Sequence, residues 1–341
     1  MISSIFFISK NHCIISSAMG SVITLLLAFI VSLGITLVLM PLYIKALKAL
    51  KYSQTVSEYA LEEYKEKGKT PIMGGLLFVV IPLVVVALID IRTLFDPVCL
   101  LIIISYVSFC FIGFLDDILI IIRHDNEGLA PKFKMALQLI FALVIWLIFK
   151  DVMGSDLYLP LIGIRLPLGI FYGLFCVFMY TAEANAVNFT DGMDGLCSGV
   201  SIIAIVPYLV FALIEGRYDI ALLIVSIIGA LLGYLRYNFF PAKIFMGDSG
   251  SLALGALFTS IAIALDKELL LIVVGGVFFW EMLCVCIQQL AVRLFHKRVF
   301  KFTPIHYAFV LDGLKEKTVV KRFYIIQAIC SLIGLIIGVL G

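Results

Sequence analysis

Long apolar segments alternate with short polar ones along almost the whole chain. Ten of them approach or exceed the roughly 20 residues that an α-helix needs to cross a bilayer, at 20–45, 73–90, 97–115, 133–149, 168–187, 196–214, 219–235, 250–265, 269–294 and 322–340. Backbone polar groups in lipid must pair within their own segment, so each segment is expected to be helical. The pattern predicts an all-α, polytopic integral membrane helix bundle.

Composition agrees with this pattern. The 341 residues are 63% hydrophobic and 14% charged, with a mean hydropathy of +1.15, which excludes a soluble domain of this size. We treat 1–341 as a single transmembrane domain in which 1–19 is a lead into the first span. The eight cysteines form no CxxC pair and lie mostly in apolar segments, so we interpret them as buried apolar side chains rather than disulfides or zinc ligands.

The basic residues predict the orientation. Six of the 25 Lys and Arg residues fall in the N-terminal tail and the loops on its side, and the other nineteen fall at the opposite face. Because Lys and Arg gather on the cytoplasmic side, that opposite face is predicted to be cytoplasmic and both termini external. The cytoplasmic loops are then about 46–72, 116–132, 188–195, 236–249 and 295–321. Among the external connections, 151–167 alternates in a way that favours a small hairpin.

One stretch between two apolar segments is unusually polar. Residues 185–196 read Asn-Ala-Val-Asn-Phe-Thr-Asp-Gly-Met-Asp-Gly-Leu. Carboxylates at a membrane boundary are costly and usually serve a ligand or an ion path, while glycines let backbone N–H groups approach a ligand closely. The stretch predicts a surface loop that binds a nucleotide-linked phosphate.

Further carboxylates lie in two other loops on the same face. Asp116 and Asp117 follow the third span, where negative charge opposes the helix macrodipole, so a bound cation is a simple way to stabilise them. Asp248 lies in Phe-Met-Gly-Asp-Ser-Gly-Ser, 245–251. Solvated helix ends, caps and turns would also explain these residues. Their occurrence on one membrane face favours a metal–diphosphate site, since Mg²⁺ prefers a few carboxylates together with phosphate oxygens.

Four motifs together resemble the polyprenyl-phosphate N-acetylhexosamine-1-phosphate transferase superfamily. They are Lys-x-x-Thr-Pro-x-Met-Gly-Gly at 67–75, Asp-Asp at 116–117, the polar stretch at 185–196 and Phe-Met-Gly-Asp-x-Gly-Ser at 245–251. Arg298-Val-Phe-Lys-Phe-Thr-Pro-Ile-His306 is similar to the branch of phospho-N-acetylmuramoyl-pentapeptide transferases. The resemblance covers the chain from about Gly20 onward.

The resemblance implies an enzyme of the bacterial inner membrane that depends on Mg²⁺ and forms a homodimer. It would use UDP-N-acetylmuramoyl-pentapeptide and undecaprenyl phosphate to make lipid I and UMP, with no nucleic-acid partner. It implies Asp116, Asp117 and Asp248 as catalytic carboxylates, with Asp248 and Asn188 at the metal. The implied substrate-binding residues are Lys67, Asn185, Asn188, Asp191, Gly192, Met193, Asp194, Asn238, Phe245, Gly247, Ser251 and His306.

Some alternatives stay open at this stage. The chain departs from the family pattern after His306, where Tyr307 and Ala308 stand in place of further histidines, and around Tyr64. A sister transferase using UDP-N-acetylglucosamine is the nearest enzymatic alternative. A secondary transporter would instead place polar residues at the bilayer midplane. Direct attack and a covalent aspartyl-phosphate intermediate both fit the residues.

Two features inside the ninth span carry structural predictions. Its roughly 26 residues at 1.5 Å each exceed a ~30 Å hydrocarbon core, and Gly275-Gly276 lies within it, so we expect tilt or a break there. Glu281 should face protein rather than lipid, because an unpaired carboxylate in hydrocarbon is costly. Glu183, near the end of the fifth span, is expected to support the site from behind.

Overall fold

The computed structural model describes residues 2–50, 70–123 and 128–341, with side chains from Gly20 onward within those ranges. The elements follow the apolar segments in chain order. They are α1 (Ile2–Ala49), α3 (Gly75–Ile89), the short 3-10 helix η2 (Ile91–Phe95), α4 (Pro97–Arg123), α5 (Pro131–Met153), β1 (Asp156–Leu159), β2 (Ile164–Pro167), α6 (Ile170–Thr190), α7 (Leu196–Ile214), α8 (Tyr218–Asn238), α9 (Asp248–Ala264), α10 (Leu271–Val274), α11 (Gly276–Phe295), α12 (Ile305–Leu311) and α13 (Glu316–Leu340).

The predicted membrane bundle is confirmed. Within the described residues, eight helices are long and apolar enough to cross a membrane, and α3 and α9 are shorter apolar helices. Each predicted span therefore coincides with helix. The expected break in the ninth span is also present, because α10 ends at Val274 and α11 begins at Gly276.

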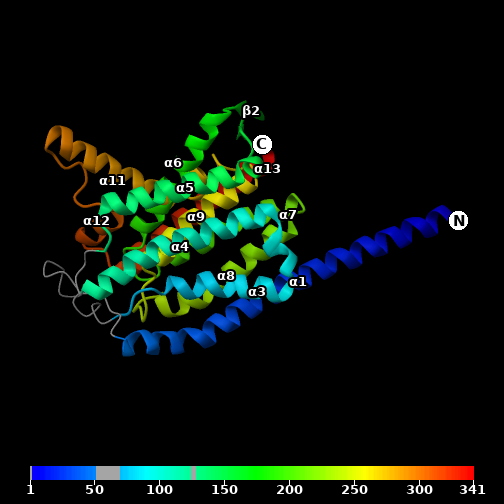
Figure 1. Ribbon diagram of the computed structural model, residues 1–341, viewed down its shortest axis with the longest axis horizontal. Helices are drawn as coiled ribbons and strands as arrows, with labels where there is room; N and C mark the ends of the chain where they lie inside the picture. Colours follow the sequence, from blue (N-terminus) through cyan, green and yellow to red (C-terminus); the bar gives the residue numbers. More distant parts are fainter. Residues whose placement is uncertain (1, 51–69, 124–127) are drawn as a thin grey trace.

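Helix α9 lies at the centre of the bundle and positions the site (Figure 1). Every residue from Ser249 to Ile263 is buried, and α9 packs against α3, α4 and α6. Glycines permit the close approach, as small residues do in other membrane bundles. A Cβ on Gly113 of α4 would lie 2.0 Å from the Asp248 carbonyl oxygen, and one on Gly255 would lie 2.4 Å from Ala184 of α6.

Several predicted boundaries were wrong. The loop 116–132 begins later, because α4 continues to Arg123 through the apolar run Ile118–Ile122. Asp116 and Asp117 therefore lie inside α4 rather than at its end, so the predicted conflict with the helix macrodipole at a helix terminus was wrong. Part of the predicted loop 188–195 belongs to α6, and 295–321 contains α12 and the start of α13. The lead 1–19 is not separate, since α1 begins at Ile2.

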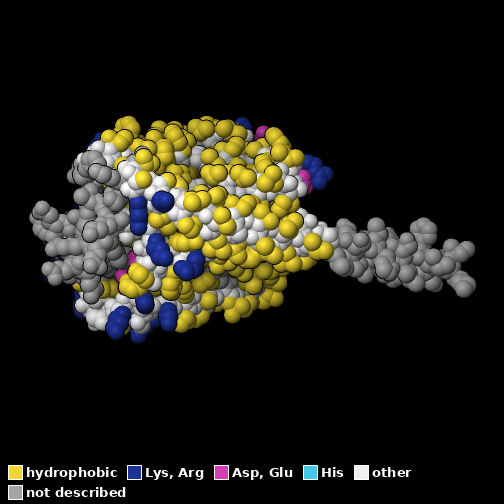
Figure 2. All heavy atoms as spheres, turned by 90° about the horizontal axis from the view of Figure 1, so that it is seen from below, with side chains coloured by type: hydrophobic (Ala, Val, Ile, Leu, Met, Phe, Trp, Pro, Cys, Tyr) yellow, Lys and Arg dark blue, Asp and Glu magenta, His cyan; other side chains and the backbone are white. Residues whose placement is uncertain are grey.

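The two ends of the bundle differ in character. At one end β1 and β2 form the predicted hairpin, with Leu157 opposite Leu166, and Tyr158 donates a hydrogen bond to the carbonyl of C-terminal Gly341. The other end carries clustered Lys and Arg side chains beside an apolar flank (Figure 2). We call it the basic end. It contains the last turns of α4, α8 and α11, with Arg123, Arg236 and Arg293.

Candidate active site

The first turn of α9 is capped by a carboxylate from α4. A helix start leaves its first backbone N–H groups without partners inside the helix. Asp117 accepts the backbone N–H of Asp248 at 2.9 Å and that of Ser249 at 3.0 Å. Gly247 precedes them at φ +72°, where an added Cβ would lie 2.5 Å from an Asp117 oxygen. Glycine is therefore required at 247, and Asp117 fixes where Asp248 lies.

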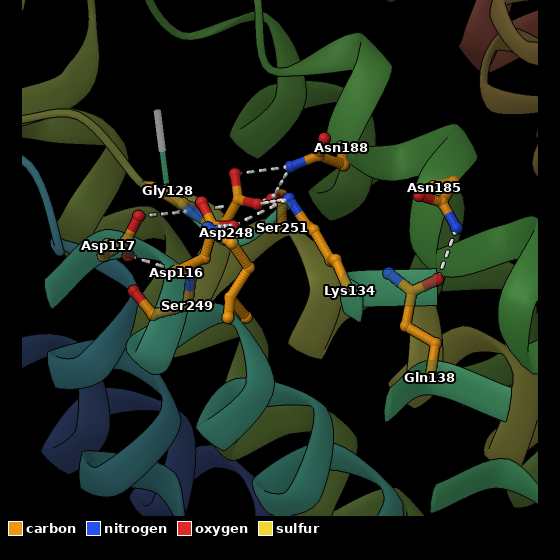
Figure 3. Close-up of polar contacts among 12 residues, drawn as sticks. Asp116, Asp117, Gly128, Lys134, Gln138, Asn185, Asn188, Asp248, Ser249 and Ser251 are labelled. Carbon is orange, nitrogen blue, oxygen red and sulfur yellow. Dashed lines mark hydrogen bonds and ion pairs between the residues drawn. The ribbon is translucent and has the colours of Figure 1, made fainter. Parts of the chain in front are cut away.

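Three carboxylates meet at this helix start (Figure 3). One oxygen from each of Asp116, Asp117 and Asp248 lies within 4.8 Å of the others. Lys134 of α5 forms an ion pair with Asp248, and its ammonium lies 3.7 Å from Asp116. Asp116 also accepts the backbone N–H of Leu129 at 3.0 Å. We call these four charged side chains the carboxylate cluster.

Helix α6 adds a neutral donor to the cluster. The Asn188 side-chain amide donates to Asp248 at 2.8 Å and to the Ser251 hydroxyl at 2.9 Å. Ser251 in turn donates to the Gly247 carbonyl at 3.2 Å. Asn188 and Ser251 thus lie at the predicted site, where they orient the Asp248 carboxylate.

The donor set fits a divalent cation. Three carboxylates face one ammonium group, so ionised carboxylates leave an excess of negative charge that a cation would neutralise. Asp116 and Asp248 are the better candidate ligands, because both Asp117 oxygens already accept backbone N–H groups. Asn188 directs its amide nitrogen at Asp248, and nitrogen of that amide is a donor rather than a metal ligand.

The family model and the individual relatives that this chain matches are all transferases. Residues 99–266, which include most of this site, match the model of glycosyl transferase family 4. The chain is 40% identical over 316 residues to the phospho-N-acetylmuramoyl-pentapeptide-transferase of Staphylococcus saprophyticus, covering 91% of this chain and 98% of that protein. It is 40% identical over 313 residues to the protein of that name from Clostridium botulinum strain Eklund 17B, covering 92% and 96%.

The chain belongs to the phospho-N-acetylmuramoyl-pentapeptide-transferase family. The enzyme of that name from Staphylococcus aureus strain MSSA476 is likewise 40% identical, over 319 residues. Because these matches span nearly whole proteins, they cover the carboxylate cluster and the loops around it together.

The loop after α6, residues 191–195, contains four of the predicted substrate-binding residues. Asp194 accepts the backbone N–H of Ala242 at 2.9 Å, and Met193 is buried in the core beneath. Gly195 has φ +78°, and its carbonyl accepts the Tyr324 hydroxyl at 2.6 Å. The C-terminal end of the loop is thus held by other elements, and Asp191 and Gly192 form its first part, directly after α6.

Asn238 holds this loop from α8. Its side-chain oxygen accepts the Gly195 backbone N–H at 3.2 Å and the Ser198 hydroxyl at 2.8 Å. Its amide group donates to the Ile244 carbonyl at 3.0 Å, and the residue is 2% exposed. Asn238 therefore joins two loops and positions the 191–195 loop, while its predicted contact with substrate stays a prediction.

The backbone of Phe245 is held by residues 71–74. Its backbone N–H donates to Pro71 at 2.8 Å, and its carbonyl accepts the N–H of Gly74 at 2.9 Å. The Phe245 side chain packs against a small apolar cluster that includes Met73 and Ile121. Phe245 precedes Gly247 by two residues, so these contacts fix the segment that leads into the carboxylate cluster. Lys67, the motif residue predicted upstream, lies outside the described residues.

His306 is fully buried beside the 191–195 loop. Its ring Nδ1 lies 3.1 Å from Glu281 of α11, and Glu281 also accepts the backbone N–H of Ile305 at 2.7 Å. A Cβ on Gly192 would lie 2.1 Å from the His306 Nε2, and Tyr307 donates to the Gly192 carbonyl at 2.8 Å. The expectation that Glu281 faces protein is confirmed, and it caps α12.

Two predicted residues lie apart from the cluster. Asn185 donates to Gln138 at 2.6 Å and to the Thr181 carbonyl at 2.7 Å, away from Asp248 (Figure 3). Glu183 lies near the helix break, where one of its oxygens is 3.5 Å from the Cβ position of Gly275. Neither touches the carboxylates in this structure.

Lys134 belongs to the carboxylate cluster but was not assigned to the site from the sequence. As a lone lysine it could equally serve the positive-inside pattern. Its position in the chain could have indicated a partner. Lys134 is the fourth residue of α5, after Pro131 at the helix start, and therefore lies one turn inside a membrane helix. A lysine so placed usually pairs with a carboxylate.

Asp191 has a strongly altered environment. Burial raises its pKa from 3.8 to about 7, and the charges of Asp117 and Asp194 add to the effect. The unfolded chain releases this proton near pH 4, while the folded chain keeps it until about pH 7. Ionisation of Asp191 therefore destabilises the fold progressively as pH rises between those values, with no further change above them.

We expect Asp191→Asn to remove this pH dependence, because asparagine does not titrate. The melting temperature of the variant minus that of the wild type should rise as pH increases from 5 to about 7, then level off. Thermal unfolding of both proteins across that range is the measurement. A constant difference between the two would contradict the burial of Asp191.

Proposed function

We propose that the chain transfers phospho-N-acetylmuramoyl-pentapeptide from its UDP-linked donor to undecaprenyl phosphate, forming lipid I and releasing UMP. The observation that carries the proposal is the carboxylate cluster at the start of α9, built from three helices and including one ammonium group. It lies at the basic end, where a lipid phosphate can be reached from the bilayer surface.

The reaction brings two anions together. An oxygen of the lipid phosphate attacks the β-phosphorus of the donor, and the bond from that phosphorus to the UMP oxygen breaks with its electron pair. A phosphate monoester has a second pKa near ~6, so the nucleophile is largely ionised near neutral pH. The enzyme therefore needs charge stabilisation and alignment more than a strong base.

We propose Mg²⁺ as the cation, held chiefly by Asp248 and Asp116. When bound, it supplies neutralisation of the diphosphate and of the departing UMP. Lys134 lies between the same two carboxylates, so its ammonium is placed to contact a phosphate oxygen once the carboxylates have a cation to share. Asn188 keeps the Asp248 carboxylate oriented.

The 191–195 loop is proposed to bind the donor, with Phe245 and Gly192 on the nucleoside and diphosphate. Support comes from its construction: Asn238, Tyr324 and Tyr307 hold its backbone, so its central residues are preorganised. Binding by a rigid loop costs less ordering than binding by a mobile one.

The setting is proposed to be a bacterial inner membrane, with the basic end cytoplasmic and the enzyme a homodimer. The Lys and Arg side chains at that end (Figure 2) support the orientation by the positive-inside rule. Both the hairpin and Gly341 lie at the opposite end.

Donor choice tests the proposal. Purified protein would be given undecaprenyl phosphate, Mg²⁺ and either UDP-N-acetylmuramoyl-pentapeptide or UDP-N-acetylglucosamine, and UMP release would be measured. We expect turnover with the pentapeptide donor alone. UMP release only from UDP-N-acetylglucosamine would assign the chain to the sister reaction. Solute flux into proteoliposomes without UMP release would identify a transporter.

A further inference from the structure

A hollow lies at the basic end, beside the end of α8 and the segment that follows it. Its volume is about 580 Å³, and it is lined by Leu232, Leu235, Arg236, Phe239, Phe240, Pro241 and Lys243. None of these residues belongs to the carboxylate cluster. The hollow is thus separate from the site at which the proposed reaction occurs.

The lining of the hollow is apolar in one part and positively charged in another. Leu232 and Leu235 lie three residues apart on one face of α8, and Phe239 follows directly after the helix ends at Asn238. Together these three side chains form an apolar strip in the hollow. The strip ends in two exposed cations, Arg236 and Lys243. An apolar strip with cations at the bilayer boundary matches a phospholipid, whose chains lie in the core and whose phosphate lies at the surface. A soluble anion would gain nothing from the strip.

The two cations of the hollow have no acidic partner in the part of the chain that the structure describes. Among the described residues, no carboxylate lies within ion-pair distance of Arg236 or Lys243. Arg236 instead lies over the Tyr237 ring at 5.8 Å, and nearby Lys317 lies over the Phe240 ring at 4.6 Å. The contact with Tyr237 positions Arg236 and leaves its charge for an external anion.

The inner wall of the hollow is the back of the 191–195 loop. A Cβ on Gly195 would lie 3.2 Å from Phe239 and 3.4 Å from Leu235. Asp194 accepts the backbone N–H of Ala242, within the segment 239–243 that bounds the hollow. A molecule that fills the hollow would therefore stabilise the position of this loop.

We propose that the hollow binds an anionic phospholipid of the surrounding leaflet, with its phosphodiester between Arg236 and Lys243 and its chains against Phe239 and Leu235. Occupancy stabilises the 191–195 loop and so favours donor binding. This second effect rests on the proposed function, whereas the binding itself does not.

Lipid binding can be measured without any substrate. Full-length protein would be mixed with phosphatidylglycerol or phosphatidylcholine in detergent, and retained lipid counted by native mass spectrometry. The variant is Arg236→Gln with Lys243→Gln. Its matched control is Arg293→Gln with Lys297→Gln, two exposed cations at the end of α11. We expect the wild type and the control to prefer phosphatidylglycerol, and the variant to bind it about thirtyfold more weakly.

An equal loss of phosphatidylglycerol binding in the variant and the control would show that the lipid responds to surface charge in general, and this result would overturn the proposed site. Equal retention of both lipids by the wild type would also overturn it. Displacement of phosphatidylglycerol by equimolar undecaprenyl phosphate, with loss of both in the variant, would identify a site for the acceptor instead.

The effect on the loop has its own readout. In bilayer nanodiscs containing phosphatidylglycerol, the variant should show a severalfold higher KM for the UDP-linked donor, with the KM for undecaprenyl phosphate unchanged. Lost lipid binding with an unchanged donor KM would contradict the coupling alone. Absence of all turnover in the wild type would contradict the proposed function and leave the binding result standing.

Discussion

Asp248→Asn is expected to lower turnover by roughly 100- to 1,000-fold, as loss of one group that stabilises transition-state charge does elsewhere, while the protein still folds. Asp248 forms an ion pair with Lys134, accepts a hydrogen bond from Asn188 and lies within 4.8 Å of the carboxylate oxygens of Asp116 and Asp117. Asparagine keeps the size and one acceptor oxygen but removes the charge that a cation and Lys134 require. Steady-state UMP release at saturating substrates is the measurement.

The control makes the same chemical change at an exposed place. Asp312 pairs with Lys301 at the surface of the basic end, and surface pairs contribute little. Asp312→Asn should therefore retain near-normal turnover and melting temperature. If Asp248→Asn also turned over normally with Mg²⁺ in excess, the carboxylate would not be a metal ligand.

The second large effect is expected at the neighbouring residues Asp116 and Asp117, whose asparagine variants should differ in stability. Asp117→Asn should lower both stability and activity. Both Asp117 oxygens accept backbone N–H groups at the start of α9, and asparagine has one acceptor oxygen and one donor group there. A buried N–H without a partner costs about 1–3 kcal/mol, and loss of negative charge beside the helix start adds about 0.3–1 kcal/mol.

Asp116→Asn should behave differently. Its main protein contact, the Leu129 N–H, can still be accepted by the amide oxygen, so the melting temperature should stay near that of the wild type. Activity should fall, and the Mg²⁺ concentration needed for half-maximal rate should rise. Thermal unfolding and Mg²⁺ titration of both variants are the measurements. Equal melting temperatures for the two variants would refute the capping contribution of Asp117.

The carboxylate cluster shows how far local sequence information reaches. Asp116, Asp117 and Asp248 were predicted to share a site because loops of one membrane face share a location, and the structure brings them together. Their division of labour was not predictable. It depends on Gly113 allowing α4 to approach the Asp248 backbone, a contact between residues 135 positions apart in the chain.

The same limit applies to other residues. His306, Asn238 and Asn185 were predicted to bind substrate, and that stays a prediction. In the structure their hydrogen bonds go to Glu281, the backbone of Gly195 and Ile244, and Gln138, while the buried His306 Nε2 has no hydrogen-bond partner among the described residues. A polar residue in an apolar chain signals that a partner is needed. It does not indicate whether that partner is a ligand or another helix.

The sequence by itself determined the membrane bundle, the helical state of its apolar segments and the hairpin, and it predicted tilt or a break at Gly275-Gly276. These features depend on hydropathy, segment length and local backbone freedom, which are properties of consecutive residues. Tertiary structure decided the continuation of α4 past Asp117, the insertion of Lys134 among the carboxylates and the capping of α9 and α12 by Asp117 and Glu281. Those depend on which helices pack together and how closely, because a hydrogen bond between distant residues forms only after packing has removed water from between them.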